Sequence, residues 1–219
     1  MSEIRALAFD LDGTLADTAL DLVDCAQEVC ADIGWDNIPD EVFKEQISMG
    51  SVAMVAAGLN RERTDPLVQK TAVRLQKRYA ARPANLTQLY DGIAEVIHDA
   101  HRRDWPWCIV TNKPAALAHL VMDGLEPLPP GIAGVIGSGT TWHAKPSPQP
   151  LRLASQLMGI APEHIAFVGD DRRDIDCARA VGARSIAALW GYIHRHDNPM
   201  DWGADRYAET PGQLTRAFE

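Results

Sequence analysis

The chain has 219 residues, which is enough for one large domain or for a core domain with a smaller insert. Its net charge of −9 argues against nucleic acid as a partner, because a phosphate backbone needs a basic face. No apolar run approaches membrane-spanning length, and the N-terminus lacks a basic region followed by an apolar stretch. We therefore expect a cytoplasmic protein with no membrane partner.

The first predicted strand leads directly into a pair of acids. Ile4–Phe9 is a short apolar run, which indicates a buried strand, and Asp10-Leu11-Asp12-Gly13-Thr14-Leu15-Ala16-Asp17-Thr18 follows it. In open parallel α/β sheets, ligands bind at the carboxyl ends of the strands. Carboxylates this close repel each other unless a cation lies between them. Asp10 and Asp12 thus predict a site for a hard divalent ion, with Mg²⁺ as the leading candidate.

The segment after Thr18 shows helical spacing of its apolar residues and no strand. The predicted helices are Ala19–Ile33, Glu41–Ile47, Val52–Leu59 and Pro66–Arg82. A helical insert placed directly after the first strand is able to act as a lid. Its loop Ser48, Met49, Gly50 and Ser51 either approaches the strand-end site and selects the substrate, or is a plain turn between helices.

Strands and helices alternate after the insert, which predicts a parallel sheet with right-handed crossovers. The predicted strands are Trp107–Val110, Ile132–Ile136, Ile165–Val168 and Ser185–Leu189, and the tail from Trp190 is predicted to hold turns and a short terminal helix. Polar side chains follow the strands, namely Thr111 and Asn112, then Lys145, then Asp170, Asp171 and Asp174.

These polar side chains, with the first pair of acids, compose one site. It offers a carboxylate nucleophile, a second acid, a hydroxyl and a cation for an anion, and further acids for a metal. Each stretch alone has an ordinary interpretation as a turn, a helix cap or a solvated lysine. Their meeting at one edge of the sheet is what indicates chemistry.

The stretches DLDGTLADT, TNK, KPSP and GDDRRD resemble the four motifs of the haloacid dehalogenase superfamily, in order and spacing, over essentially the whole chain. The resemblance implies an α/β fold, with a Rossmann-like three-layer core, a parallel sheet and an inserted α-helical cap. We expect the core domain to comprise residues 1–17 and 87–219, and the cap domain to comprise residues 18–86.

The resemblance also implies roles for the residues that match these motifs. Asp10 would be the nucleophile that forms an aspartyl-phosphate, and Asp12 would be the general acid and then the general base. Thr111 and Asn112 would hold the phosphoryl oxygens, and Lys145 would neutralise the charge that develops on them.

The metal site implied by the resemblance binds Mg²⁺ through Asp10, Asp170 and the backbone carbonyl of Asp12. Asp174 would support the ion from behind these ligands or through water. Asp171 is a departure from the family pattern, since many of these phosphatases carry Ser there, and it is left open as a direct ligand.

The acid at position 12 favours a phosphatase or a phosphomutase over a dehalogenase. The chain is similar to the phosphoglycolate phosphatase branch, which acts on small phosphorylated metabolites. Its tail, over Gly191–His194 and Trp202–Asp205, resembles the bacterial N-acetylmuramic acid 6-phosphate phosphatases of cell-wall sugar recycling, or else is a structural strap. The hypothesis is an Mg²⁺-dependent phosphomonoesterase, with N-acetylmuramate 6-phosphate ahead of 2-phosphoglycolate. A phosphomutase and a catalytically silent binding protein are the alternatives, and monomer and dimer are equally compatible with the sequence.

Overall fold

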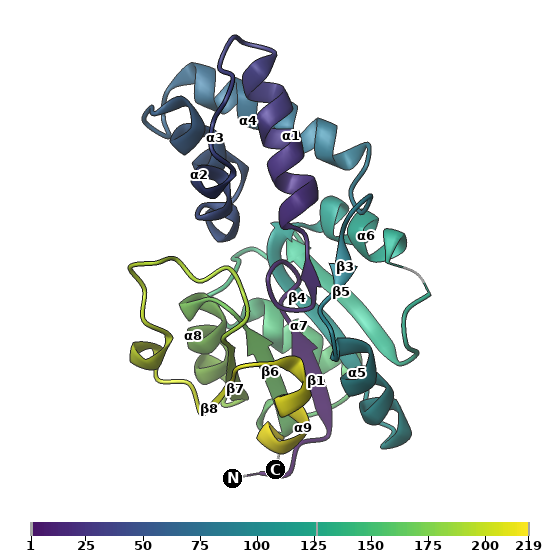
Figure 1. Cartoon of the computed structure of the whole chain (residues 1–219). Helices are drawn as coiled ribbons and strands as arrows, with labels where there is room; N and C mark the ends of the chain where they lie inside the picture. Colours follow the sequence, from purple (N-terminus) through teal and green to yellow (C-terminus); the bar gives the residue numbers. More distant parts are fainter. Residues whose placement is uncertain (1, 126, 219) are drawn as a thin grey trace.

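The strand β1 (Ala6–Phe9) lies inside a parallel sheet whose order is β5-β4-β1-β6-β7-β8 (Figure 1). The computed structural model describes residues 2–125 and 127–218, so residues 1, 126 and 219 of the predicted core segments lie outside the described residues. The other strands are β4 (Trp107–Pro114), β5 (Ile132–Ser138), β6 (Ile165–Gly169), β7 (Arg184–Ala188) and β8 (Arg206–Ala208). The predicted parallel sheet is thereby confirmed. The edge strand β8 is a correction, because the tail pattern predicts no strand and three residues are too few to show a period of two.

Helices cover both faces of this sheet, which gives three layers. Alternate residues of β1 point to opposite faces, so Leu7 and Phe9 pack in one apolar cluster and Ala6 and Ala8 in another. The first cluster includes residues of α5 (Ile93–Arg102), α6 (Ala115–Gly124) and α9 (Leu214–Ala217). The second includes residues of α7 (Gln149–Met158) and α8 (Arg172–Val181). Short 3₁₀ turns lie at Pro162–His164, Pro199–Trp202 and Pro211–Gln213. Both clusters bury apolar area, at roughly 25 cal/mol per Å², on either side of the strand that carries Asp10.

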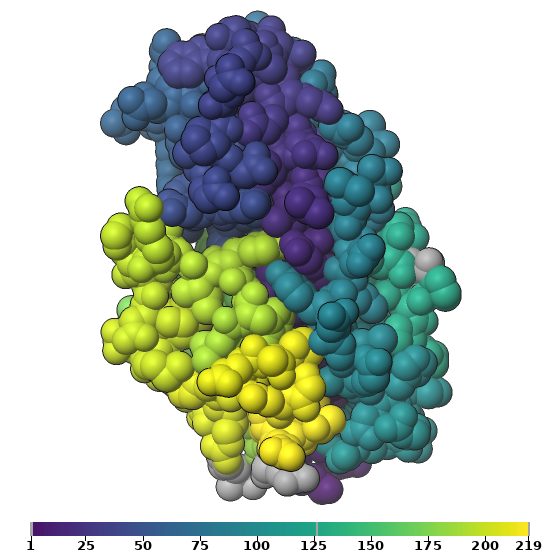
Figure 2. Space-filling model, in the orientation of Figure 1, coloured from purple at the N-terminus to yellow at the C-terminus, as the bar shows by residue number. Residues whose placement is uncertain are grey.

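Four helices, which we call the helical insert, stand beyond the carboxyl edge of the sheet (Figure 1). They are α1 (Ala19–Ala31), α2 (Asp40–Lys44), α3 (Ser51–Leu59) and α4 (Pro66–Ala80). The predicted helix over Glu41–Ile47 is shorter than expected, because the chain turns into a 3₁₀ segment at Ile47–Met49. Figure 2 shows the purple and blue insert stacked on the rest of the molecule, with the yellow-green tail reaching up to it.

The chain enters and leaves the insert through a two-stranded antiparallel ribbon. Its strands are β2 (Ala16–Asp17) and β3 (Gln88–Leu89), which pair through Ala16 with Leu89 and Asp17 with Gln88. The ribbon holds the two connections side by side, so the insert is joined to the sheet at one place. None of the helices among the described residues combines the length and apolar character needed to cross a membrane.

Candidate active site

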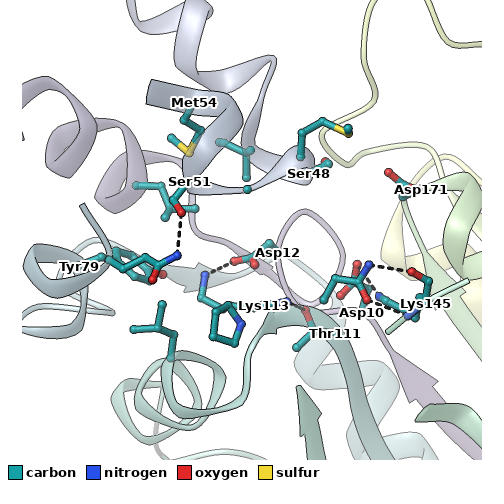
Figure 3. Close-up of a pocket in the computed structure, with 18 of the residues that line it drawn as sticks. Asp10, Asp12, Ser48, Ser51, Met54, Tyr79, Thr111, Lys113, Lys145 and Asp171 are labelled. Carbon is teal, nitrogen blue, oxygen red and sulfur yellow. Dashed lines mark hydrogen bonds and ion pairs between the residues drawn. The ribbon is translucent and has the colours of Figure 1, made fainter. Parts of the chain in front are cut away.

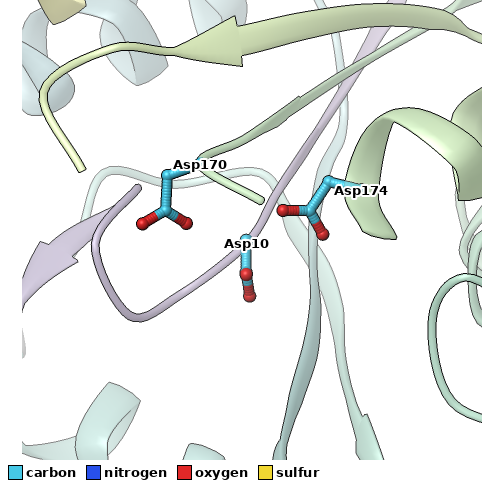
Figure 4. A group of neighbouring side chains, drawn as sticks. All are labelled: Asp10, Asp170 and Asp174. Atoms are coloured by element: carbon cyan, nitrogen blue, oxygen red, sulfur yellow. The ribbon is translucent and has the colours of Figure 1, made fainter. Parts of the chain in front are cut away.

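Three carboxylates meet at the carboxyl edge of the sheet (Figure 4). Asp10 follows β1, Asp170 follows β6, and Asp174 belongs to the first turn of α8, and one oxygen of each lies within 4.8 Å of the others. Burial raises the pKa of Asp170 well above its usual range, and the charges of Asp10 and Asp174 raise it further. Burial also raises the pKa of Asp174 to about 7, in spite of the nearby ammonium of Lys145. Negative charge on these neighbouring acids is therefore unfavourable without a counter-ion, and a cation between them would stabilise their charged forms.

Both oxygens of Asp170 accept hydrogen bonds from residues far away in the chain. Thr14 Oγ1 donates to Oδ1 at 3.1 Å, and the Tyr192 backbone N–H donates to Oδ2 at 2.7 Å. Gly13 passes against the same carboxylate with φ of +79°, and a Cβ there would stand 2.2 Å from Asp170 Oδ2. The motif loop therefore needs glycine at this position both for its backbone angle and for space.

The ammonium group of Lys145 lies beside the acids, and its three N–H donors have three partners. Its Nζ is 3.0 Å from Asp10 Oδ2 and 2.6 Å from Asp174 Oδ1, and it donates to the carbonyl of Val110 at 2.8 Å. Burial lowers the pKa of Lys145, but the two carboxylates outweigh burial and raise it. The side chain is only 2% exposed, so a permanent positive charge sits beside Asp10 inside the protein.

Asn112 contacts the backbone of Lys145. Its side-chain amide donates to the Lys145 carbonyl at 3.0 Å, and its Oδ1 accepts from the Lys145 N–H at 3.0 Å. Asn112 thereby fixes the backbone of Lys145, and its expected contact with phosphoryl oxygens stays a prediction. The buried hydroxyl of Thr111 lines the pocket and accepts from the Lys113 N–H at 3.2 Å.

Asp12 stands apart from the three clustered acids. Its Oδ1 accepts from Thr18 Oγ1 at 2.6 Å and from Lys113 Nζ at 2.7 Å. Sequence reasoning missed Lys113 because it ended the strand at Val110, whereas β4 continues to Pro114. With the longer strand, Thr111 and Lys113 share one face by the period of two, and this alternation was the available signal.

Asp171 points its carboxylate at a neighbouring arginine. Arg173 donates from Nε to Asp171 Oδ1 at 2.7 Å and from Nη2 to Oδ2 at 2.6 Å. Burial raises the pKa of Asp171, but Arg173 outweighs it and lowers the pKa. The residue left open as a metal ligand therefore caps α8 and holds Arg173, and it is not among the three acids that cluster. Arg173 also donates from Nη2 to the carbonyl of Ser48 in the insert at 2.6 Å, a contact that no local pattern in the sequence signals.

A pocket of about 220 Å³ lies between the acids and the helical insert (Figure 3). Asp10, Asp12, Thr111 and Lys145 line it from the core. The whole predicted loop Ser48–Ser51 lines it from the insert, which agrees with a loop that approaches the strand ends and not with a plain turn. Apolar side chains of the insert also line it, namely Leu22, Ile47, Met54, Leu75 and Tyr79, and Leu117 of α6 joins them from the core. The core side of the pocket is thus charged, and its insert side is mostly apolar.

The parallel three-layer sheet, with acids, a hydroxyl and a lysine at one edge under a helical insert, is the architecture of an α/β enzyme. A family model described as haloacid dehalogenase-like hydrolase matches residues 4–182, and the chain belongs to this family. It is 35% identical to N-acetylmuramic acid 6-phosphate phosphatase of Pseudomonas putida, covering 99% of this chain and 96% of the relative. It is 38% identical to phosphoglycolate phosphatase of Xanthomonas campestris, covering 96% and 94%.

The fold also matches solved structures along its full length. The crystal structure of a predicted phosphoglycolate phosphatase from Haemophilus somnus superposes with a TM-score of 0.87 at 20% identity, covering 100% of both chains. This likeness shows the fold. The family and the relatives together identify the chain as a phosphoric monoester hydrolase.

Proposed function

We propose that the protein is an Mg²⁺-dependent phosphomonoesterase that hydrolyses a small phosphorylated metabolite through an aspartyl-phosphate. The observation that carries the proposal is the setting of Asp10. Its carboxylate is 3.0 Å from the ammonium of buried Lys145, it borders the pocket, and a second acid, Asp12, lines the same pocket. This is the arrangement that a carboxylate nucleophile and a general acid need.

The residues present fit a magnesium ion. The clustered ligand atoms are all carboxylate oxygens, which are the donors that Mg²⁺ prefers, and their mutual repulsion calls for a cation. Asp10 and Asp170 would hold the ion together with the backbone carbonyl of Asp12, and Asp174 would support it. When bound, the ion supplies positive charge to the phosphoryl oxygens.

The chain's own residues carry the two steps of the reaction. In the first step, an oxygen of Asp10 attacks phosphorus, the bond from phosphorus to the ester oxygen breaks, and Asp12 gives that oxygen a proton. In the second step, Asp12 takes a proton from water as the water attacks phosphorus, which releases phosphate and restores Asp10. Lys145 and the Thr111 hydroxyl stabilise charge on the phosphoryl oxygens in both steps.

We assign residues 18–86 as the cap and residues 1–17 and 87–219 as the core. The cap supplies most of the apolar lining of the pocket and the loop Ser48–Ser51, and the ribbon of β2 and β3 joins it to the core. A cap over the pocket limits the access of bulk water to the acids and contacts the part of the substrate beyond the phosphate. With the reacting groups in the core and the contacts to the rest of the substrate in the cap, a change in the cap alone would change which metabolite is bound.

N-acetylmuramate 6-phosphate is the leading substrate. The match with the N-acetylmuramic acid 6-phosphate phosphatase of Pseudomonas putida covers nearly the whole of both chains. The tail stretch Gly191–His194 also resembles this group of phosphatases. The second candidate, 2-phosphoglycolate, rests on the 38% identity with the relative from Xanthomonas campestris. Values of kcat/KM for the two esters with Mg²⁺, measured side by side, decide between them. A preference for the glycolate ester would overturn the leading assignment and leave the phosphatase mechanism in place.

The mechanism is tested with Asp10→Asn, which keeps the shape of the side chain and removes its nucleophilic charge. We expect phosphate release to fall by at least about a thousandfold while thermal unfolding stays cooperative. Asp24→Asn on the exposed side of α1 is the matched control and should leave the rate unchanged. EDTA should abolish turnover and Mg²⁺ should restore it. Normal turnover in Asp10→Asn would remove Asp10 as the nucleophile.

A further inference from the structure

Tyr192 lies in the tail, yet its hydroxyl group is bound to the first residues of the insert. The hydroxyl donates to Asp17 Oδ1 at 2.6 Å and accepts from the backbone N–H groups of Thr18 at 2.7 Å and Ala19 at 2.9 Å. These N–H groups belong to the start of α1, where a helix has no partners of its own for its first N–H groups. Tyr192 therefore binds the start of α1 from a place 174 residues further along the chain, and Asp17 Oδ1 is a second acceptor for the Ala19 N–H, at 3.1 Å.

The Thr18 side chain contacts Asp12 and does not cap its own helix. Thr18 occupies the N-cap position, where a threonine side chain normally accepts from the helix's own N–H groups. Here Thr18 makes no such side-chain bond. Its fully buried hydroxyl donates to Asp12 Oδ1 at 2.6 Å instead. The Tyr192 hydroxyl accepts from the backbone N–H of this same threonine, so it fixes the residue whose side chain contacts Asp12.

The other end of Tyr192 is fixed to the core. Its backbone N–H donates to Asp170 Oδ2 at 2.7 Å. The preceding Gly191 passes so close that an added Cβ would stand 2.2 Å from the Cβ of Asp170. The tail is thereby bound to Asp170 through the Tyr192 backbone and to the start of α1 through the Tyr192 hydroxyl. Both ends of this residue are fixed.

We infer that Tyr192 is a positioning residue, which holds Thr18 against Asp12 so that Asp12 can pass its proton to the leaving oxygen. The inference rests on the proposed function, in which Asp12 is the general acid. Without the Tyr192 hydroxyl, the backbone N–H of Thr18 loses its acceptor and Thr18 is no longer fixed from the tail, so its hydroxyl would hold Asp12 less firmly while Lys113 stays as a donor. Proton delivery would suffer before binding of the phosphate did, because Asp10, Thr111 and Lys145 are untouched.

The test uses Tyr192→Phe and two kinds of substrate. An alkyl phosphomonoester, such as 2-phosphoglycolate, needs a proton on its leaving oxygen, whereas 2,4-dinitrophenyl phosphate has a leaving group that departs without one. We expect kcat/KM to fall about tenfold on the alkyl ester and less than about twofold on the dinitrophenyl ester. Asp12→Asn should show the same dependence on leaving group, more strongly. Tyr207→Phe is the control, since this tail hydroxyl contacts only the carbonyl of Met200, at 3.4 Å, among the described residues.

Variants at Thr18 test the link between the two residues. Thr18→Val should reproduce the defect of Tyr192→Phe, whereas Thr18→Ser keeps the hydroxyl and should retain the activity of the wild type. The double variant Tyr192→Phe/Thr18→Val should be no less active than either single variant. These variants also decide the matter should Tyr192→Phe fail to fold.

Two results would overturn the inference in distinguishable ways. Equal losses on both substrates in Tyr192→Phe or Thr18→Val, with Asp12→Asn still dependent on the leaving group, would make Tyr192 a merely structural residue. No dependence on leaving group in Asp12→Asn itself would instead overturn the proposed role of Asp12, and the inference would fall with it.

Discussion

Lys113 Nζ lies 2.7 Å from Asp12 Oδ1, and the two side chains are 5% and 19% exposed. The same ammonium stands 4.5 Å from the centroid of the Tyr79 ring, which belongs to α4 of the insert (Figure 3). A cation of the core, an acid of the first motif and an aromatic ring of the insert thus meet at the wall of the pocket. The carboxylate and the ring face both stabilise the buried charge of Lys113.

Replacing Lys113 by Met should slow turnover and destabilise the fold. The variant leaves Asp12 without its charged partner, so we expect kcat/KM to fall by about ten- to a hundredfold and the free energy of unfolding by about 1–3 kcal/mol. Urea unfolding and steady-state kinetics measure the two effects. Lys70→Met, on the exposed side of α4, is the control. The double variant Asp12→Asn/Lys113→Met should regain stability but not activity, and a further loss of stability would contradict a direct ion pair.

Replacing Asp170 by Asn should stabilise the metal-free protein in a way that depends on pH. The raised pKa of Asp170 means that the folded state binds its proton more tightly than the unfolded chain does. Asp170 therefore costs stability increasingly as the pH rises from about 4 through its raised pKa. In EDTA, the advantage of Asp170→Asn over the wild type should grow over this range to about 1–3 kcal/mol.

Magnesium should reverse that advantage. Adding Mg²⁺ at neutral pH should raise the melting temperature of the wild type, because the ion relieves the repulsion, and should leave Asp170→Asn nearly unchanged. Asp36→Asn on an exposed loop serves as the control. An advantage of Asp170→Asn that is constant with pH would show that charge repulsion is not its source.

The strand-end residues could be predicted because their signal is local. A short apolar run fixes a strand, parallel strands share their carboxyl edge, and so Asp10, Thr111, Lys145 and Asp170 had to come close together. The helical insert was likewise visible in the spacing of its apolar residues. Element ends were less predictable, as the longer β4 shows, since they depend on pairing with neighbouring strands and not on the segment itself.

The side-chain contacts between distant parts of the chain could not be predicted, for a physical reason. Tyr192 reaches Thr18 over 174 residues, and Arg173 reaches Ser48 over 125, so each contact depends on the finished tertiary structure. Asn112 shows the same limit, because an amide after a strand fits a phosphate contact and a backbone clamp equally well. Residue type placed it in the site, and only the geometry assigned its hydrogen bonds to Lys145.

Replacing Met49 by Ala should change the ranking of substrates more than the intrinsic rate. Met49 lies in the loop that lines the pocket, and its side chain is half exposed. We expect the ratio of kcat/KM between N-acetylmuramate 6-phosphate and 2-phosphoglycolate to change by about tenfold, with less than about twofold change on an aryl phosphate. Met200→Ala, an equally exposed methionine of the tail, is the control. Equal losses on all three esters would make the loop merely structural.

Arg173 ties the loop of the insert to the core, and its removal should weaken substrate binding. The guanidinium grips Asp171 through two nitrogens and donates to the Ser48 carbonyl at 2.6 Å. In Arg173→Met the loop loses this tie and opens more readily, so we expect KM for the metabolite to rise about tenfold while kcat changes less than about threefold. Arg173→Lys should recover little, because an ammonium cannot make the forked contact.

The neighbouring arginine makes the prediction for Arg173 specific. Arg172 stands beside it on α8, is 63% exposed, and makes a long ion pair of 3.8 Å with Asp176. Arg172→Met removes the same charge from the same helix turn without touching the loop, so its KM should match that of the wild type. If both variants raised KM alike, the effect would be long-range attraction of an anionic substrate, and high salt would abolish it. A rise confined to Arg173→Met that persists in high salt would assign it to the position of Arg173, which contacts Ser48 and lines the pocket.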